Sequence, residues 1–375
     1  MRYYIIAGEA SGDLHGSNLI RELRARDSLA QVRCWGGDLM QAAGGELVRH
    51  YRDLAFMGFV EVVSNLGTIL RNLKFCKQDI RAFRPDTLVL IDYPGFNLRI
   101  ARWAHEQGIR VIYYISPQVW AWKENRVPMM KQCIDRMLVI LPFEKAYFRD
   151  KWHWEVDYVG HPLVEVIEKY QARGITTRFS ERPVIALLPG SRRQEIEKKL
   201  PIMLEVSRAF PDYQFIVAQA PSIEPAFYET FTRPFPNVSA VSNQTYELLL
   251  QARAALVTSG TATLETALFG VPEVVCYKGS PISYQIARRV IRVSYISLVN
   301  LIMNKLVVRE LIQQELTPDN IRQALQELLN DPARQAALSS DYQELKRVLR
   351  EGGNASAQAA RLIVETVTTW KGSGN

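Results

Sequence analysis

Cysteine is scarce and scattered in this chain of 375 residues. Cys34, Cys76, Cys133 and Cys276 form no C-x-x-C pair and no short Cys/His pairing, which disfavours a disulfide framework and a structural zinc site. A run of 18 or more uncharged apolar residues is also absent, so no membrane span is predicted. The N-terminal MRYYIIAGEASGD does not match a signal peptide. We therefore expect reduced cysteines in a cytoplasmic protein that is soluble or peripheral on a membrane.

Strong charge of one sign is absent as well. Lysine and arginine number 46 against 39 aspartates and glutamates, a formal net charge of +7. This modest excess suggests attraction to an anionic partner. Nucleic acid is disfavoured as that partner, because the basic residues do not cluster with aromatic residues in a repeated pattern and no nucleic-acid-binding module occurs. Hydrophobic residues make up 47% and charged residues 23%, which is typical of an ordinary globular protein.

Short apolar runs alternate with longer helical patterns throughout the chain. Runs such as TLVLID (87–92) and RVIYYI (110–115) are continuously apolar, as is typical of parallel strands covered on both faces. The alternation predicts βαβ units and an α/β fold. We expect strands at Arg2–Ala7, Val32–Trp35, Thr87–Asp92, Val111–Ile115, Arg136–Ile140, Val156–Val159, Val184–Leu188, Gln214–Ala218, Val238–Val241, Ala254–Thr258 and Glu273–Cys276.

The length and the polar segment Tyr170–Pro183 indicate two domains joined by a linker. We predict Rossmann-like, doubly wound domains at 1–172 and 173–348 that face a cleft at the carboxyl ends of both sheets. The tail from Pro318 is almost all helical, and Gly352–Gly353 separates its last two helices. The segment 349–375 is expected to pack back on the N-terminal domain.

Two loops in the first half carry more than turn chemistry. In GEASGD (8–13), Gly8 and Gly12 let the backbone approach a ligand, and the following helix N-terminus favours anions. A tight turn with Ser11 or Asp13 as the N-cap explains this loop equally well. In the second loop an apolar strand ends at Asp92 before Pro-Gly turns the chain. A carboxylate at such an edge suits a general base, and we favour that role over a turn aspartate.

The loop LPGSRRQEI (188–196) follows the first strand of the second half. Gly190 and Ser191 precede Arg192 and a helix, an arrangement that holds a phosphate through backbone N–H groups, the helix dipole and a guanidinium. The loop lacks the P-loop pattern, which disfavours phosphoryl transfer. The first loop of the chain is not G-x-G-x-x-G, which disfavours a nicotinamide-dependent oxidoreductase.

A second anion-binding turn is predicted in TSGTATLE (258–265), where Ser259, Gly260 and Thr261 follow a strand. Glu265 lies one turn into the next helix, where a carboxylate can accept hydrogen bonds from both ribose hydroxyls. Two phosphate-type loops with a ribose-type acid indicate a nucleoside diphosphate as ligand.

Several motifs occur in a fixed order: GEASGD, MGFVEV (57–62), IDYPGFN (91–97), SPQVWAWKENR (116–126), GHPL (160–163), LPGSRRQEI, SGTATLE and NL…ELIQ (300–313). Together they resemble the lipid-A-disaccharide synthases, GT-B glycosyltransferases of family 19, over almost the whole chain. The resemblance implies transfer of 2,3-diacylglucosamine from its UDP-activated form to 2,3-diacylglucosamine 1-phosphate (lipid X). The products would be the β(1→6) lipid A disaccharide 1-phosphate and UDP, formed with inversion and without a metal or other cofactor.

The resemblance also assigns roles to residues. Asp92 matches the suspected base, and Arg192 matches the arginine on the diphosphate side. The donor positions are Gly190, Ser191, Arg192, Ser259, Gly260, Thr261, Glu265, Asn300, Glu310 and Gln313. The acceptor-side positions, in the N-terminal domain, are Gly8, Ser11, Gly12, Asp13, Asn97 and Gln118.

Acylated sugars require contact with the inner face of the inner membrane of a Gram-negative-type bacterium. An apolar stripe with helical spacing and neighbouring basic residues could provide that contact, as an amphipathic element at the interface. Packing of the same stripe into the first domain is the commoner outcome for such a helix. The stripe and its basic neighbours are Phe59, Val62, Val63, Leu66, Leu70, Leu73, Arg71 and Lys74.

Other functions keep the same fold. A UDP-GlcNAc 2-epimerase or another UDP-GlcNAc transferase is disfavoured by IDYPGFN and MGFVEV, which lie in the acceptor half. A non-catalytic nucleotide-sugar binding protein is disfavoured by the presence of both Asp92 and Arg192. The resemblance also implies that a homodimer with exchanged C-terminal segments can form, as it can in family members, and the helical tail permits such a dimer here.

Overall fold

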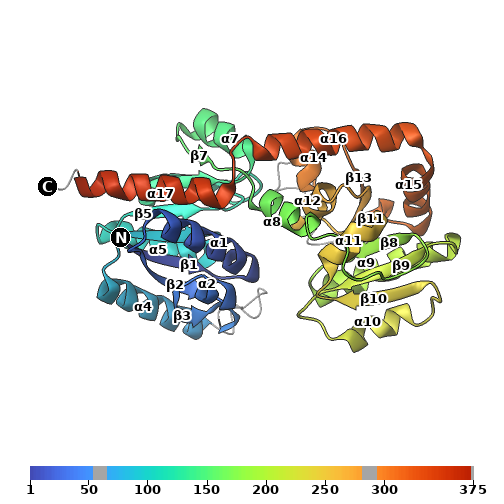
Figure 1. Ribbon diagram of the computed structural model, residues 1–375, viewed down its shortest axis with the longest axis horizontal. Helices are drawn as coiled ribbons and strands as arrows, with labels where there is room; N and C mark the ends of the chain where they lie inside the picture. The colour runs from blue at the N-terminus through green and yellow to red at the C-terminus, as the bar shows by residue number, and fades with distance from the viewer. Residues whose placement is uncertain (54–65, 281–293, 373–375) are drawn as a thin grey trace. The chain divides into compact units, whose positions relative to one another are not determined.

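The computed structural model describes residues 1–53, 66–280 and 294–372 (Figure 1). The chain forms two compact units, the first made of Met1–Pro162 with Leu349–Asn375 and the second of Leu163–Val348. Each unit is built on one parallel sheet with helices on both faces, so the predicted α/β class is confirmed. No helix within the described ranges combines the length and the apolarity needed to cross a membrane.

The sheet of the first unit has seven strands, which pair in the order β3-β2-β1-β4-β5-β6-β7. They are β1 (Arg2–Ala7), β2 (Gln31–Gly36), β3 (Glu46–His50), β4 (Thr87–Ile91), β5 (Val111–Tyr114), β6 (Arg136–Val139) and β7 (Asp157–Tyr158). The helices are α1 (Ala10–Arg26), α2 (Asp38–Ala42), α4 (Leu66–Phe83), α5 (Pro94–Glu106), α6 (Val127–Cys133), α7 (Pro142–Trp152) and α17 (Ala355–Gly372), with short 3₁₀ turns at η1 (Tyr51–Asp53) and η2 (Glu124–Arg126).

Side chains of this sheet alternate between two cores, because successive residues of a strand point to opposite faces. Tyr4 and Ile6 belong to the core that includes residues of α4, α5, α6 and α7. Tyr3 and Ile5 belong to the core that includes residues of α1, α2 and α17. Both faces are therefore buried, which explains the continuous apolar runs in the sequence.

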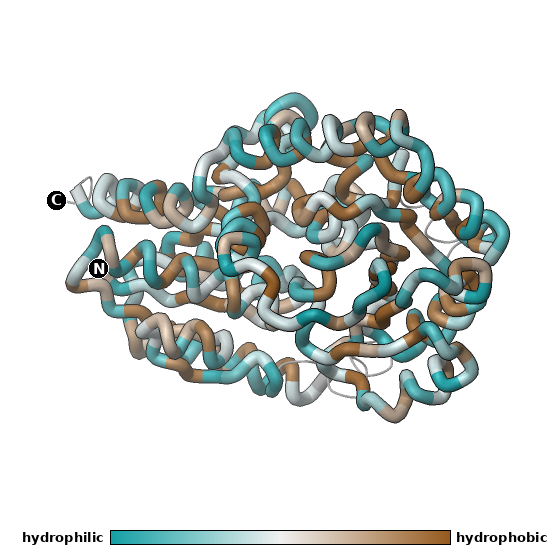
Figure 2. Tube along the Cα trace, turned by 45° about the vertical axis from the view of Figure 1, so that its right-hand side comes forward, coloured by the Kyte–Doolittle hydropathy of each residue, from teal (hydrophilic) through white to brown (hydrophobic). Residues whose placement is uncertain are grey.

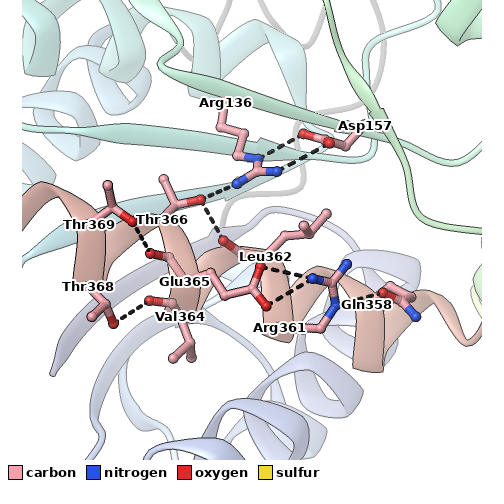
Figure 3. Close-up of polar contacts among 10 residues, drawn as sticks. All are labelled: Arg136, Asp157, Gln358, Arg361, Leu362, Val364, Glu365, Thr366, Thr368 and Thr369. Carbon is pink, nitrogen blue, oxygen red and sulfur yellow. Dashed lines mark hydrogen bonds and ion pairs between the residues drawn. The ribbon is translucent and has the colours of Figure 1, made fainter.

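The C-terminal helix α17 completes the first unit (Figure 1). It packs beside α1, and Figure 2 shows hydrophobic and hydrophilic residues alternating along it. Arg136 on β6 donates to Thr366 of this helix and holds Asp157 on β7 with two further hydrogen bonds of 2.8 and 3.2 Å (Figure 3). The turn before α17 passes so close to Gly160 that a β-carbon at Gly352 would overlap its backbone.

The second unit has a sheet of six strands in the order β10-β9-β8-β11-β12-β13. The strands are β8 (Val184–Leu188), β9 (Gln214–Gln219), β10 (Val238–Ser242), β11 (Ala252–Val257), β12 (Glu273–Tyr277) and β13 (Arg309–Ile312). The helices are α8 (Pro162–Gln171), α9 (Arg193–Val206), α10 (Pro225–Thr232), α11 (Thr245–Gln251), α12 (Thr261–Leu268), α14 (Leu298–Met303), α15 (Pro318–Asn330) and α16 (Pro332–Arg350), with 3₁₀ turns at η3 (Ser207–Ala209) and η4 (Gln313–Glu315).

The observed boundaries differ from the predicted ones in two respects. The units divide between Pro162 and Leu163, whereas the sequence placed the boundary after residue 172. Helix α8 accounts for the difference, because Glu168 pairs with Lys346 at 3.1 Å within the second unit. The edge strands β3 and β13 were not predicted, since ELVRH and RELI are short, polar and only partly buried.

Asp13 ties the first turn of α1 to the beginning of α2. Its Oδ1 accepts hydrogen bonds from the backbone N–H groups of Gly37 (2.8 Å) and Met40 (3.0 Å), and its Oδ2 accepts one from Leu39 (3.2 Å). These donors lie at the N-terminus of α2, where backbone N–H groups have no partner within the helix. Asp13 therefore caps a helix other than its own.

Replacing Asp13 by alanine should lower the free energy of unfolding by about 2–3 kcal/mol, because buried N–H groups lose a charged acceptor. Urea unfolding followed by circular dichroism measures this change. Asp53→Ala, at an exposed carboxylate, is the matched control. Equal stability of the two variants would contradict the capping role.

Candidate functional site

Asp92 is the first residue after β4 and begins a strained turn. Asp92 and Tyr93 both have positive φ angles, 43° and 50°, a conformation that non-glycine residues seldom adopt. Such strain concentrates at functional sites and persists only where surrounding contacts hold it. The contacts are present here, because Tyr113 donates to the Asp92 carbonyl oxygen at 2.5 Å and Asn97 donates to the same oxygen at 2.8 Å.

Asn97 therefore acts on the backbone around Asp92. Its side chain is fully buried, and its Nδ2 also donates to the carbonyl oxygen of Ile91 at 3.2 Å. Gly8, after the neighbouring strand β1, is needed for a related reason, since a β-carbon there would overlap the ring of Tyr93. Gly8 and Asn97, two of the predicted acceptor-side residues, thus shape the Asp92 turn.

The electrostatic setting of Asp92 suits a general base. Burial and the nearby negative charge of Glu9 raise the pKa of its carboxyl group to about 6. Glu9 is close because β1 and β4 pair with Ala7 opposite Ile91, which brings the two following loops together. A carboxylate with a pKa near 6 is mostly ionised at neutral pH, and it binds a proton more strongly than an ordinary aspartate.

Glu144, near the beginning of α7, is an acid that the sequence analysis missed. It is buried, and burial raises the pKa of its carboxyl group to about 8, with a smaller contribution from the charge of Asp92. Its oxygens accept hydrogen bonds from the backbone N–H of Leu141 (3.0 Å) and from the indole N–H of Trp120 (3.2 Å). The local sequence Leu-Pro-Phe-Glu resembles an ordinary capped helix start, so the contact with Trp120 has no local signal.

The other predicted acceptor-side residues are divided between surface and interior. Ser11 and Gln118 are exposed after β1 and β5, where a ligand can reach them. Gly12 is buried, and a β-carbon there would lie 3.0 Å from that of Ala7. Asp13 is turned inward onto α2, so its carboxylate is occupied by the fold.

The predicted phosphate loop after β8 leads directly into α9. Gly190 has a φ of 121°, which favours glycine, and a β-carbon there would lie 2.6 Å from Glu195 Oε2. Ser191 and Arg192 are exposed. The Arg192 side chain is 68% accessible, and its Nη1 lies 3.7 Å from Glu195 Oε1. The arginine is thus held only weakly and is free to pair with an anion.

The second predicted anion loop lies next to the first. Strands β8 and β11 pair with Leu188 opposite Val257, and Thr258 N–H donates to the Leu188 carbonyl oxygen at 2.9 Å. Ser259, Gly260 (φ 117°) and Thr261 then lead into α12. The structure therefore places the two predicted anion loops next to each other.

Glu265 lies on the second turn of α12. Its Oε1 accepts a hydrogen bond from the hydroxyl of Tyr246 at 2.7 Å, and burial raises the pKa of its carboxyl group. The hydrogen bond fixes the orientation of the carboxylate and leaves its second oxygen as a further acceptor.

The last predicted motif is mostly internal structure. Asn300 is fully buried, and its side chain exchanges hydrogen bonds of 2.8–2.9 Å with the backbone of Val307 and Val308 and with Glu310. Glu310 also accepts from the backbone N–H of Ser297 at 2.9 Å. Gln313, by contrast, is buried with a positive φ of 55°, and its amide nitrogen has no hydrogen-bond partner among the described residues. Of the three, Gln313 is the one with a donor left for a ligand.

A further missed residue is Lys199 on α9. Its side chain is only 2% exposed, and its ammonium donates to the hydroxyl of Thr258. This hydrogen bond joins the helix that follows the first phosphate loop to the beginning of the second loop. Within the described part of the chain, no group of three or more His, Cys, Asp or Glu side chains could hold a metal ion.

The predicted membrane stripe is only partly described. Phe59, Val62 and Val63 lie outside the described residues, as does the motif MGFVEV. In α4, Leu70 is 57% exposed and Arg71 and Lys74 are exposed, whereas Leu73 is a core residue. The stripe is therefore split, because α4 uses Leu73 to cover the sheet. Leu66 begins the helix.

The lipid-A-disaccharide synthetase family model matches residues 3–364. The lipid-A-disaccharide synthase of Syntrophus aciditrophicus is 39% identical over 369 residues, which cover 96% of each chain. Among solved structures, the UDP-GlcNAc 2-epimerase from Neisseria meningitidis bound to UDP-GlcNAc has a TM-score of 0.67 at 14% identity, covering 98% of this chain and all of that one. The glycotransferase of kitacinnamycin has a TM-score of 0.67 at 19% identity, covering 98% and 99%.

At these identities the two structures show the fold alone, which is GT-B, with two parallel sheets and a helical C-terminal stretch. The family match and the Syntrophus relative extend over nearly the whole chain, so the resemblance in the sequence motifs is confirmed. The chain belongs to the lipid-A-disaccharide synthase family and is a glycosyltransferase that forms a lipid A disaccharide.

Proposed function

We propose that this enzyme transfers 2,3-diacylglucosamine from its UDP-activated form to 2,3-diacylglucosamine 1-phosphate. The products are the β(1→6) disaccharide 1-phosphate and UDP. The first unit binds the acceptor, and the second unit binds the UDP-sugar. The observation that carries the proposal is the Asp92 carboxylate, held at the edge of the first sheet with a pKa raised to about 6. An acceptor hydroxyl needs such a base, because it must lose its proton as it attacks.

The proposed reaction is a single displacement that inverts the anomeric configuration. Asp92 takes the proton from the acceptor 6-hydroxyl as the oxygen attacks the anomeric carbon, and UDP leaves from the opposite face. Arg192 and the N-termini of α9 and α12 stabilise the negative charge that develops on the diphosphate. These groups supply the charge that a metal ion supplies in other transferases, so we propose a metal-independent reaction.

Asp92→Asn should lower kcat by about 10²–10⁴-fold while UDP binds as before, because only the proton transfer is lost. Arg192→Ala should lower kcat and also weaken UDP binding, because the guanidinium contacts the diphosphate. Thin-layer detection of the tetraacyl disaccharide, with EDTA present, and calorimetry with UDP measure the two effects. Arg208→Ala, at an exposed arginine elsewhere on the second unit, is the control. Full turnover by Asp92→Asn would remove it as the base.

The rate should fall below about pH 6, where the raised pKa of Asp92 leaves its carboxyl group protonated. Glu9→Gln removes a neighbouring negative charge, so it should lower the pKa of Asp92 and move the acid limb of the kcat profile to lower pH. Glu106→Gln, at an exposed acid on α5, should leave the limb in place. If the acid limb does not move in Glu9→Gln, Asp92 is not the group whose protonation limits kcat.

We further propose peripheral association with the inner face of the inner membrane of a Gram-negative bacterium. The support is the outer surface of α4, where exposed Leu70 and Phe75 alternate with exposed Arg71 and Lys74. Apolar side chains beside basic ones are typical of elements that bind anionic lipid.

Reversing Arg71 and Lys74 to glutamate should weaken binding to vesicles that contain phosphatidylglycerol by at least about tenfold at low salt, since each basic residue contributes about 1 kcal/mol. A sedimentation assay measures the bound fraction. The double variant Arg208→Glu/Arg253→Glu carries the same charge change on the second unit and should bind as the wild type does. If the two double variants lose vesicle binding equally, the loss depends on net charge alone and not on the surface of α4.

A further inference from the structure

Lys199 is a charged side chain in the interior of the second unit. Burying an ammonium is costly unless partners compensate for the lost water. The described partners are weak, because Thr258 contributes a neutral hydroxyl and Glu195 Oε2 lies 4.0 Å from the ammonium nitrogen. The position thus retains a charge for which the fold itself provides little compensation.

The ammonium lies at the point where the two phosphate loops meet. Lys199 comes from the second turn of α9, and Thr258 is the first residue after β11. A β-carbon on Gly190, in the other loop, would lie 3.4 Å from the same ammonium nitrogen. One buried cation therefore touches the loop after β11 and lies against the loop after β8.

A purely structural role does not require this charge. An apolar side chain of similar length would fill the space, and replacing a buried ion with well-packed apolar residues is often neutral or stabilising. Burial lowers the pKa of Lys199, against the opposing influence of Glu195 on its own helix and Cys276 on β12. An anion bound on the two loops would favour the charged form and so repay the cost of burial.

We propose that Lys199 is a positioning residue of the donor site, whose buried ammonium holds the 189–192 and 258–261 loops together around the phosphates of a nucleoside diphosphate. This inference rests on the proposed donor site in the second unit. Lys199 does not occupy the position of a P-loop lysine, because it lies on the second turn of α9, whereas a P-loop lysine directly follows the last glycine of its loop. Its charge acts on the phosphates through Thr258 and the backbone at Gly190.

Lys199→Met keeps the length of the side chain and removes its charge. We expect the variant to bind UDP at least about tenfold more weakly, with the KM for the UDP-sugar rising more than kcat falls, and with thermal stability equal to or above that of the wild type. Lys199→Arg keeps a charge and should recover part of the affinity. Lys198→Met, at the exposed neighbouring lysine, should bind UDP as the wild type does.

Proton uptake separates this role from a structural one. Above about pH 8 the diphosphate of UDP is fully ionised, since a terminal phosphate has a pKa of about 6. Burial lowers the pKa of Lys199 from its ordinary value of about 10.4, and bound phosphates should raise it again. Calorimetry in buffers of different ionisation enthalpy, repeated at increasing pH from about 8 to about 10, should therefore show that the wild type takes up protons when UDP binds once the pH is high enough for Lys199 of the free protein to lose its proton. Lys199→Met should lose this uptake, and so should Lys199→Arg, because arginine stays charged.

Two results would overturn the proposal at different levels. If Lys199→Met binds UDP with wild-type affinity and with the same proton uptake, Lys199 has no part in the donor site, and the proposed function stands. If the wild type itself does not bind UDP, the donor site is wrong and Lys199 falls with it. Should Lys199→Met not fold, Thr258→Val removes the hydroxyl that holds the ammonium, and unchanged affinity and proton uptake in that variant would likewise exclude the role.

Discussion

Parallel pairing of two central strands in each sheet is the constraint on which the functional residues depend. In the first unit β1 and β4 pair so that Gly8–Glu9 lies beside Asp92–Tyr93. In the second unit β8 and β11 pair so that the loop containing Gly190 lies beside Thr258. Because parallel strands end at the same edge of a sheet, each pairing turns two loops that are distant in sequence into one continuous surface.

Small residues and internal hydrogen bonds keep those surfaces in place. A side chain at Gly8 would displace Tyr93, and Asn97 holds the carbonyl oxygen of Asp92. Asp13 holds α2, which follows the next strand of the same sheet. These contacts explain how consecutive non-glycine residues persist in a strained backbone conformation beside the proposed base. Many of the motif residues in the first unit thus hold the backbone of the site in place. Only the remaining motif side chains are left to touch a substrate.

The two units differ in the sign of the charge that they place at the site. The first unit gathers acids, Glu9, Asp92 and Glu144, so that burial and like charges raise the pKa of the last two. The second unit places a buried ammonium and an exposed arginine around loops that begin helices. A base that holds its proton more strongly and a site that attracts anions are the two requirements of transfer from a nucleotide-activated sugar.

The sequence by itself determined the α/β class, eleven of the strands to within about two residues, the family and the loops that carry Asp92 and Arg192. These features are local, because strand periodicity, glycine turns and ordered motifs are written in consecutive residues. Only the tertiary structure decided that Glu9 raises the pKa of Asp92, that Glu144 holds Trp120, and that Lys199 reaches Thr258. It also decided that Leu73 belongs to the core and that Asn300 serves the fold. Desolvation and electrostatic contact depend on which distant residues are brought together, and no local pattern records that proximity.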